Sequence, residues 1–227
     1  MRRRRVRAAV VAALVTILAA ACSPVTVGSG VTMLTPLVVV LHGLGGSGGD
    51  TRTFGFDEIE GVLVAHPDGV ERSWNAGTCC GKAHEQRVDD VARLDALVAR
   101  MVAEEGADPD RVYAVGFSNG AMMAYAWACG SRTPAGIGVV GGARVAPCPD
   151  PGPVAVVAVH GDADRSVPIG GGVGPRSVTR HDYPSLDESL APFPDAVRIV
   201  LPGVGHEWRP GTADVLWQRL RTAVRQP

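Results

Sequence analysis

The chain has 227 residues, a formal net charge of −1, 46% hydrophobic residues and 20% charged residues. This length suits one globular domain with a substantial core, and the apolar content excludes an intrinsically disordered chain. The 29 glycines and 17 prolines follow no regular period, which excludes a collagen-like fibre. Beyond the N-terminus, no run of 18 apolar residues predicts a membrane span.

Residues 1–21 have the pattern of a secretory signal, with five arginines before an apolar run at 8–21. That run is too short to span a bilayer comfortably, although an uncleaved N-terminal anchor is the alternative. Residues 18–22 resemble a bacterial lipobox, in which Cys22 would carry lipid and become the first mature residue. Ala19-x-Ala21 equally resembles an ordinary signal-peptidase site. We expect a secreted or extracytoplasmic protein, which would contact a membrane only if Cys22 carries lipid.

Loss of the signal changes the charge balance. It removes five of the 22 basic residues and no acidic residue, so 17 basic residues remain against 23 acidic ones, a net charge of about −6. No run of Lys and Arg follows Arg7. Because nucleic-acid binding depends on basic surfaces that face phosphates, we expect no nucleic-acid partner.

Five cysteines leave one unpaired in an exported protein. If Cys22 carries lipid, the other four can form two disulfides in an oxidising compartment: Cys79, Cys80, Cys129 and Cys148. Of the three pairings, we expect a direct Cys79–Cys80 bond least, because it closes a strained eight-membered ring. A zinc site is the alternative, but the neighbouring cysteines lack Cys-x-x-Cys spacing, so we expect no metal.

From residue 36 onward, aliphatic runs typical of buried strands alternate with segments of helical periodicity. The predicted strands are 37–41, 61–65, 112–117, 137–140, 153–160 and 197–201, and the predicted helices are 88–105, 119–129 and 213–224. Either Asp89 or Asp90 can cap the first helix, and Gly106 ends it.

This alternation predicts an α/β fold with a mostly parallel sheet and helices on both faces. We expect one domain over residues 36–227, preceded by a short linker at 22–35. The Gly-, Pro- and Asp-rich stretch 170–194 is expected to be an irregular surface excursion.

The sharpest motif is Gly116-Phe117-Ser118-Asn119-Gly120, a G-x-S-x-G sequence between a predicted strand and a predicted helix. The tight turn in this context lifts the serine above the sheet edge. It also places Ser118 at a helix N-terminus, where the helix dipole favours developing negative charge. We expect Ser118 to be a nucleophile; a simple N-cap is the alternative.

The first predicted strand ends at His42-Gly43, and a glycine-rich loop follows at 44–49. In α/β-hydrolases such a loop supplies one oxyanion-hole donor, so we expect the backbone N–H groups of Leu44 and Asn119 to serve. A phosphate-binding loop is the alternative. It requires a Lys-Ser/Thr ending, or an acid after a strand about 20 residues on, and neither is present. We therefore expect no cofactor.

Two further residues complete a predicted catalytic triad. Asp164 lies in an H-G-x-x-D-x-x-V-P pattern at 160–168, with Asp162 as the rival acid, and His206 follows the last predicted strand in a glycine-rich turn. The order serine, aspartate, histidine is that of α/β-hydrolases and differs from chymotrypsin and subtilisin. We expect Ser118 to attack an ester carbonyl, His206 to transfer the proton and Asp164 to orient the imidazole.

Together these motifs resemble the secreted polyhydroxybutyrate depolymerase / feruloyl esterase-like family of α/β-hydrolases. The resemblance covers nearly all of residues 36–220 and includes His66-Pro67-Asp68-Gly69 and the 73–81 stretch, where a Trp-Asn-x-Gly motif leads into the two adjacent cysteines. It implies an extracellular serine esterase whose substrate is a polyhydroxyalkanoate-type polyester or a feruloyl or acetyl ester of polysaccharide.

The sequence departs from the family pattern at 50–61, which is short, and at 165–205, which lacks a Trp-containing helix. The second departure leaves the substrate class open. Trp208 and Trp74 are candidates for lining the substrate cleft, with core packing as the alternative for each.

Two other functions are carried as alternatives: a serine peptidase on the same fold, and a catalytically inactive cell-surface protein that binds a polymer. The complete set of Ser118, Asp164 and His206 favours the enzymes.

Overall fold

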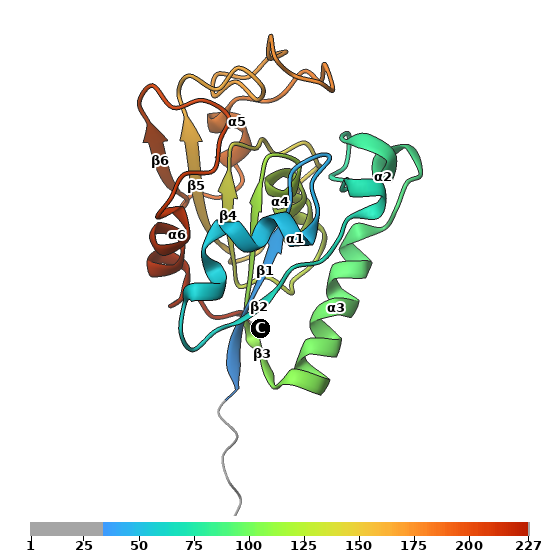
Figure 1. Cartoon of the computed structure of the whole chain (residues 1–227), viewed down its shortest axis with the longest axis vertical. Coiled ribbons are helices and arrows are strands. Elements are labelled where there is room, and N and C mark those ends of the chain that lie inside the picture. Colours follow the sequence, from blue (N-terminus) through green and yellow to red (C-terminus); the bar gives the residue numbers. More distant parts are fainter. Residues whose placement is uncertain (1–33, 227) are drawn as a thin grey trace, which may run out of the picture. The chain divides into compact units, whose positions relative to one another are not determined.

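Six strands form one sheet in the order β2-β1-β3-β4-β5-β6, and every neighbouring pair is parallel. The computed structural model shown in Figure 1 describes residues 34–226. The predicted signal at 1–21 and Cys22 lie outside the described residues. The strands are β1 (Thr35–Leu41), β2 (Leu63–Ala65), β3 (Ala107–Phe117), β4 (Gly136–Val140), β5 (Ala155–Gly161) and β6 (Val197–Leu201).

Helices connect the strands and cover the sheet. The longer ones are α3 (Asp90–Glu105), α4 (Asn119–Gly130) and α6 (Thr212–Leu220), and the short ones are α1 (Gly48–Thr51), α2 (Gly81–Glu85) and α5 (Leu186–Leu190). Three 3-10 turns lie at Arg52–Phe54, Phe56–Glu58 and Val70–Arg72. None of the helices in the described part of the chain has the length and hydropathy that a membrane crossing requires.

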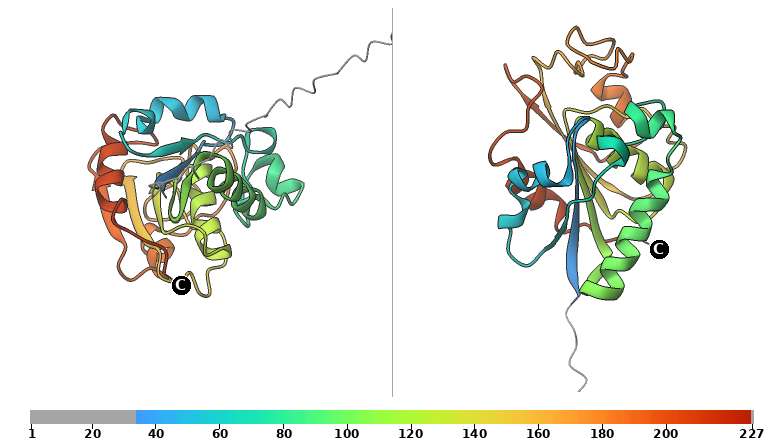
Figure 2. Two further views of the ribbon diagram at one scale, coloured as in Figure 1. Left: turned by 90° about the horizontal axis from the view of Figure 1, so that it is seen from below. Right: turned by 45° about the vertical axis from the view of Figure 1, so that its right-hand side comes forward.

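The alternation of side chains along β1 explains why both faces of the sheet are covered. Leu37, Val39 and Leu41 point to the face on which α3 and α4 pack. Val38 and Val40 point to the opposite face and share a core with Phe56 and with Leu216 of α6. These five side chains are fully buried, and Figure 2 shows α1 and α3 on opposite sides of the sheet. The predicted α/β fold is confirmed.

Two predicted boundaries differ from the structure by four residues or more. β3 begins at Ala107 rather than at residue 112, because Thr35 of β1 already pairs with Ala107 before the register shifts. The C-terminal helix ends at Leu220 rather than at 224. Beyond it the Tyr113 hydroxyl lies 3.2 and 2.7 Å from the carbonyl oxygens of residues 221 and 223 and donates to this turn.

The prediction of a surface excursion at 170–194 is wrong in part. This segment contains α5, and four of its side chains are buried in the core that α3 and α4 cover: Tyr183, Leu186, Leu190 and Phe193. The apolar residues are too widely spaced among Gly, Pro and Asp to show a strand or helix period, so the pattern did not predict their burial.

Candidate active site

Ser118 stands at the turn between β3 and α4 in a backbone conformation that few residues adopt, with φ 56° and ψ −119°. The glycines two positions before and after it allow the turn. A Cβ on Gly116 would lie 2.2 Å from the carbonyl carbon of Gly120, and a Cβ on Gly120 would lie 2.2 Å from the carbonyl oxygen of Leu41. Only glycine fits at either position, as expected for the strand-turn-helix motif.

The three residues predicted to form a triad lie in hydrogen-bond contact. His206 Nε2 is 2.9 Å from Ser118 Oγ, and His206 Nδ1 is 2.7 Å from Asp164 Oδ2. They follow β3, β5 and β6 respectively, and the carboxyl ends of parallel strands meet at one edge of the sheet. In this arrangement the serine hydroxyl donates to Nε2, and the Nδ1–H group donates to the carboxylate.

Asp164 is buried, and its carboxylate accepts several hydrogen bonds. Oδ1 accepts from the backbone N–H groups of Ser166 and Val167 at 2.8 and 2.9 Å. Burial alone would raise the pKa of Asp164, but the hydrogen bonds from His160, His206 and the Val167 backbone outweigh it and hold that pKa well below its usual range. Asp164 is therefore ionised and faces His206.

The rival acid, Asp162, is exposed and has a different partner. Its Oδ1 accepts a 2.6 Å hydrogen bond from the backbone N–H of Gly203, in the turn that leads to His206. Of the two aspartates considered, the geometry therefore selects Asp164.

The two predicted oxyanion-hole donors, Leu44 and Asn119, line the cavity beside Ser118. Asn119 is the first residue of α4, so its backbone N–H has no acceptor within that helix. The loop that carries Leu44 is held at its next residue, where the N–H of Gly45 donates to the carbonyl oxygen of Arg72 at 2.8 Å.

The His42 ring also helps to hold this loop, through two hydrogen bonds. Its Nε2 accepts from the backbone N–H of Gly69 at 2.9 Å, and its Nδ1–H donates to the carbonyl oxygen of Gly43 at 2.8 Å. Burial lowers the pKa of His42, which favours the neutral ring that these two bonds require.

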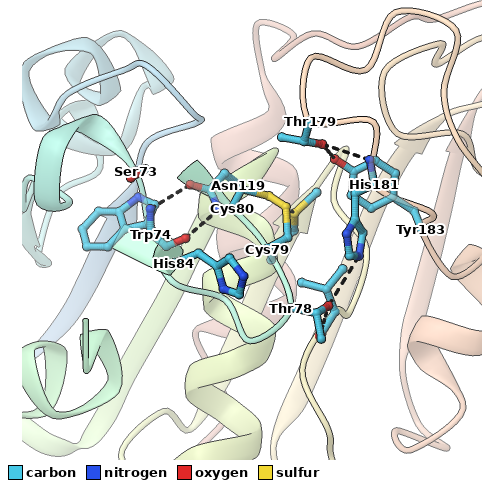
Figure 3. Close-up of a disulfide and its surroundings, with 12 residues drawn as sticks. Ser73, Trp74, Thr78, Cys79, Cys80, His84, Asn119, Thr179, His181 and Tyr183 are labelled. Atoms are coloured by element: carbon cyan, nitrogen blue, oxygen red, sulfur yellow. Dashed lines mark hydrogen bonds between the residues drawn. A yellow bond between two sulfur atoms is a disulfide. The ribbon is translucent and has the colours of Figure 1, made fainter. Parts of the chain in front are cut away.

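A role for the Asn119 side chain was missed from the sequence. Its Oδ1 accepts from the backbone N–H of Trp74 at 2.8 Å, and its Nδ2 donates to the backbone oxygen of Trp74 at 3.0 Å (Figure 3). The two bonds join the start of α4 to the loop at residues 69–81. The separation of 45 residues gave no sequence signal for this contact.

Neither tryptophan proposed for the cleft lines the cavity beside Ser118. Trp74 is 1% exposed and donates its Nε1–H to the carbonyl oxygen of His42 at 3.0 Å, so it is a core residue. Trp208 stacks on Phe54 with ring centroids 4.2 Å apart, and its Nε1–H donates to the Phe54 carbonyl. Core packing, the alternative for both, is what the structure shows.

The disulfides are Cys79–Cys80 and Cys129–Cys148. The expectation that the adjacent cysteines would avoid each other is wrong. Cys129, near the end of α4, lies beside Cys148 after β4 with 4.9 Å between their Cα atoms, which leaves Cys79 and Cys80 to pair with each other. The adjacent pair, drawn in Figure 3, is buried. Cys80 Sγ lies 3.8 Å from Met122 Sδ, and both residues line the cavity.

The cavity beside Ser118 has a volume of about 230 Å³. Part of its lining is apolar: Leu44, Cys80, Phe117, Met122 and Val167. Another part comes from residues 176–183, which carry no motif that the sequence analysis could recognise. Within residues 34–226, no group of three or more His, Cys, Asp or Glu side chains is placed to hold a metal ion.

Comparison with known proteins finds no matching family model. The chain is 36% identical over 150 residues to "Putative esterase NocK" of Nocardia uniformis subsp. tsuyamanensis, a match that covers 60% of this chain and 42% of that protein. It is 31% identical over 152 residues to "Probable feruloyl esterase C" of Aspergillus terreus, covering 60% and 52%. The chain thus spans about half the length of the curated relatives it matches.

Among solved structures, esterase PE8 superposes with a TM-score of 0.57 and 26% identity, over 84% of this chain and 93% of that one. The chain therefore has the fold of the α/β-hydrolase superfamily. The three proteins described above are all named as esterases.

Proposed function

We propose that this chain is a carboxylic-ester hydrolase that uses Ser118, His206 and Asp164 as a catalytic triad. The observation that carries the proposal is the continuous contact from Ser118 Oγ through the imidazole to the buried Asp164 carboxylate, at the wall of a cavity. The esterase names of the relatives support the same reaction class.

In the proposed mechanism, Ser118 Oγ attacks the ester carbonyl while His206 Nε2 takes the hydroxyl proton. The backbone N–H groups of Leu44 and Asn119 stabilise the oxyanion, and removal of one such donor typically costs about 10²–10³ in rate. Collapse of the intermediate breaks the ester bond, and His206 returns the proton to the departing alcohol. Water then attacks the acyl-enzyme by the same route and releases the acid.

The proposed substrates are polyhydroxyalkanoate-type polyesters or feruloyl or acetyl esters of polysaccharide. The relatives named as feruloyl esterases support the second group. Two disulfides favour an oxidising compartment, so we place the protein outside the cytoplasm. The signal at 1–21 and the single catalytic domain over 36–227 belong to the same proposal, with a lipid on Cys22 and ordinary signal-peptidase cleavage as its two alternatives.

The test is hydrolysis of p-nitrophenyl esters of increasing chain length and of methyl ferulate, with labelling by a fluorophosphonate probe. We expect S118A to lose the label and about 10⁴–10⁶ of the rate. Ser131→Ala, at the far end of α4, is the matched control and should retain both. Equal rates for the wild type and S118A would contradict the triad, and a wild type without turnover or label would contradict the enzyme.

A further inference from the structure

The cavity beside Ser118 carries one permanently charged side chain, Arg176, and no carboxylate. Among the ion pairs found within residues 34–226, none includes the Arg176 guanidinium. Three hydroxyl-bearing side chains from the same segment line the cavity with it: Ser177, Thr179 and Tyr183. We call these four residues the polar wall.

The backbone of the polar wall is anchored beside the proposed catalytic acid. The N–H of Arg176 donates to the carbonyl oxygen of Arg165, the residue after Asp164, at 2.8 Å. Gly174 packs so closely on this loop that a Cβ there would lie 2.4 Å from the carbonyl oxygen of Ser166. Arg176 therefore starts from a fixed point next to the triad, although its long side chain is exposed.

The hydroxyl groups of the polar wall are joined to one another. Thr179 Oγ1 lies 2.6 Å from the Tyr183 hydroxyl and 3.1 Å from Ser177 Oγ. Tyr183 is buried, and backbone hydrogen bonds in both directions pair it with Gly172. Figure 3 shows Thr179 and Tyr183 beside His181, across from Cys79 and Cys80. A guanidinium and a set of hydroxyl groups that line the same cavity are the groups that typically bind a carboxylate.

We infer that the esters this site prefers carry a carboxylate, which Arg176 and the hydroxyls of the polar wall bind while the apolar lining holds the rest of the substrate. This inference rests on the proposed function and specifies its substrate class. The net charge of about −6 after removal of the predicted signal gives no general attraction for anions, so the preference depends on this local cation.

Two matched pairs of esters test the inference. On the acyl side, mono-4-nitrophenyl adipate is compared with 4-nitrophenyl hexanoate; on the alcohol side, 4-acetoxybenzoate is compared with 4-acetoxybenzamide. In each pair the ratio of kcat/KM for the charged ester to kcat/KM for the neutral ester is measured. Intrinsic reactivity cancels when the ratio for a variant is divided by that for the wild type.

We expect R176Q to lower this ratio about tenfold or more in at least one pair, because the interaction joins two charged groups. R176K should lower it less, since lysine keeps the charge and loses the planar fork. Arg180→Gln is the matched control, because Arg180 is exposed in the same segment and does not line the cavity; its ratio should stay within about twofold. Salt should weaken the wild-type preference. An unchanged ratio for R176Q in both pairs would overturn the inference.

A measurement without turnover separates this inference from the proposed function. Adipate at millimolar concentration should raise the Tm of the wild type and leave that of R176Q unchanged. If no ester is hydrolysed but this Tm difference is present, the proposed function fails and the carboxylate site stands. If esters are hydrolysed while neither the ratio nor the Tm shift depends on Arg176, the carboxylate site fails and the proposed function stands.

Discussion

The 69–81 loop and the 165–183 segment both reach the cavity beside Ser118, and they are held in different ways. The first is fixed by buried groups of other elements: Gly69 to His42, and Trp74 to Asn119 and to the His42 carbonyl. Most of the second is held by its own hydroxyl groups and turns, and Val178 within it is 84% exposed. This difference fits the two proposals above, in which the first region holds the loop of Leu44 in place and the second binds the substrate.

The largest expected effect comes from Asp164, the residue that precedes the second segment. Asp164→Asn should lower kcat by about 10⁴, because an amide at this position favours the wrong imidazole tautomer. Asp162→Asn is the matched control, since Asp162 is exposed and its carboxylate accepts a hydrogen bond from the Gly203 backbone rather than from His206. Ester hydrolysis under saturating substrate measures both, and an equal loss in the two variants would contradict the assignment.

Asp164 also makes stability depend on pH. Its pKa in the folded state lies below the ordinary value of about 3.9. The stabilisation is therefore fully present above about pH 4 and is lost as the pH falls toward the lower folded-state pKa. The difference in unfolding free energy between the wild type and Asp164→Asn should shrink in acid, and urea unfolding at pH 3 and pH 7 measures it.

The core contacts of the 69–81 loop should contribute strongly to the free energy of unfolding. Trp74→Ala should cost about 3–5 kcal/mol, the range for large aromatic residues removed from a core. Trp208→Ala, the matched control, should cost less, because Trp208 packs at the edge of the core and is only partly buried. Urea unfolding of both variants measures the difference, and an equal cost would argue against the rigid role of the loop.

Removing the two disulfides should have different effects, one mainly on the free energy of unfolding and the other mainly on KM. Replacing both Cys129 and Cys148 by alanine should cost about 3 kcal/mol, because the bond closes a loop of 19 residues. Replacing Cys79 and Cys80 removes a bond between neighbours that constrains little of the unfolded chain, but it changes the cavity wall. This variant should raise KM while losing less stability, as steady-state kinetics and unfolding curves will show; the reverse pattern would contradict the comparison.

The smallest expected effect tests the hydroxyl cluster. Thr179→Val removes the nearer hydrogen-bond partner of the Tyr183 hydroxyl and should cost about 1 kcal/mol in unfolding free energy. Thr179→Ser keeps the hydroxyl and is the matched control. A loss in the serine variant as large as that in the valine variant would indicate that packing, rather than hydrogen bonding, holds this segment.

The sequence predicted which residues meet at the edge of the sheet better than it predicted the shape of the cavity. Ser118, Asp164 and His206 could be placed because each follows a strongly apolar strand, and parallel strands end at one edge. The two hydrogen bonds between Asn119 and Trp74 could not be predicted, because they join residues far apart in the chain. The polar wall could not be predicted, because Gly and Pro interrupt any periodicity around Tyr183.

The Cys79–Cys80 bond was misjudged for a related reason. The prediction considered the strain of the eight-membered ring alone. That the fold brings Cys129 beside Cys148, and so leaves Cys79 and Cys80 to pair, cannot be seen in the sequence. The roles of the two tryptophans likewise depended on burial, which a single residue in a loop pattern does not reveal.

The all-parallel sheet has a consequence for how the chain acquires its structure. No two neighbouring strands can be closed by a tight hairpin, so each ladder forms only after a crossover has brought distant segments together. Contacts between residues far apart in sequence slow the search for the native state. We expect refolding from denaturant to be slow relative to helical proteins of this size, with the sheet assembling late around β3, which pairs with β1 on one side and β4 on the other.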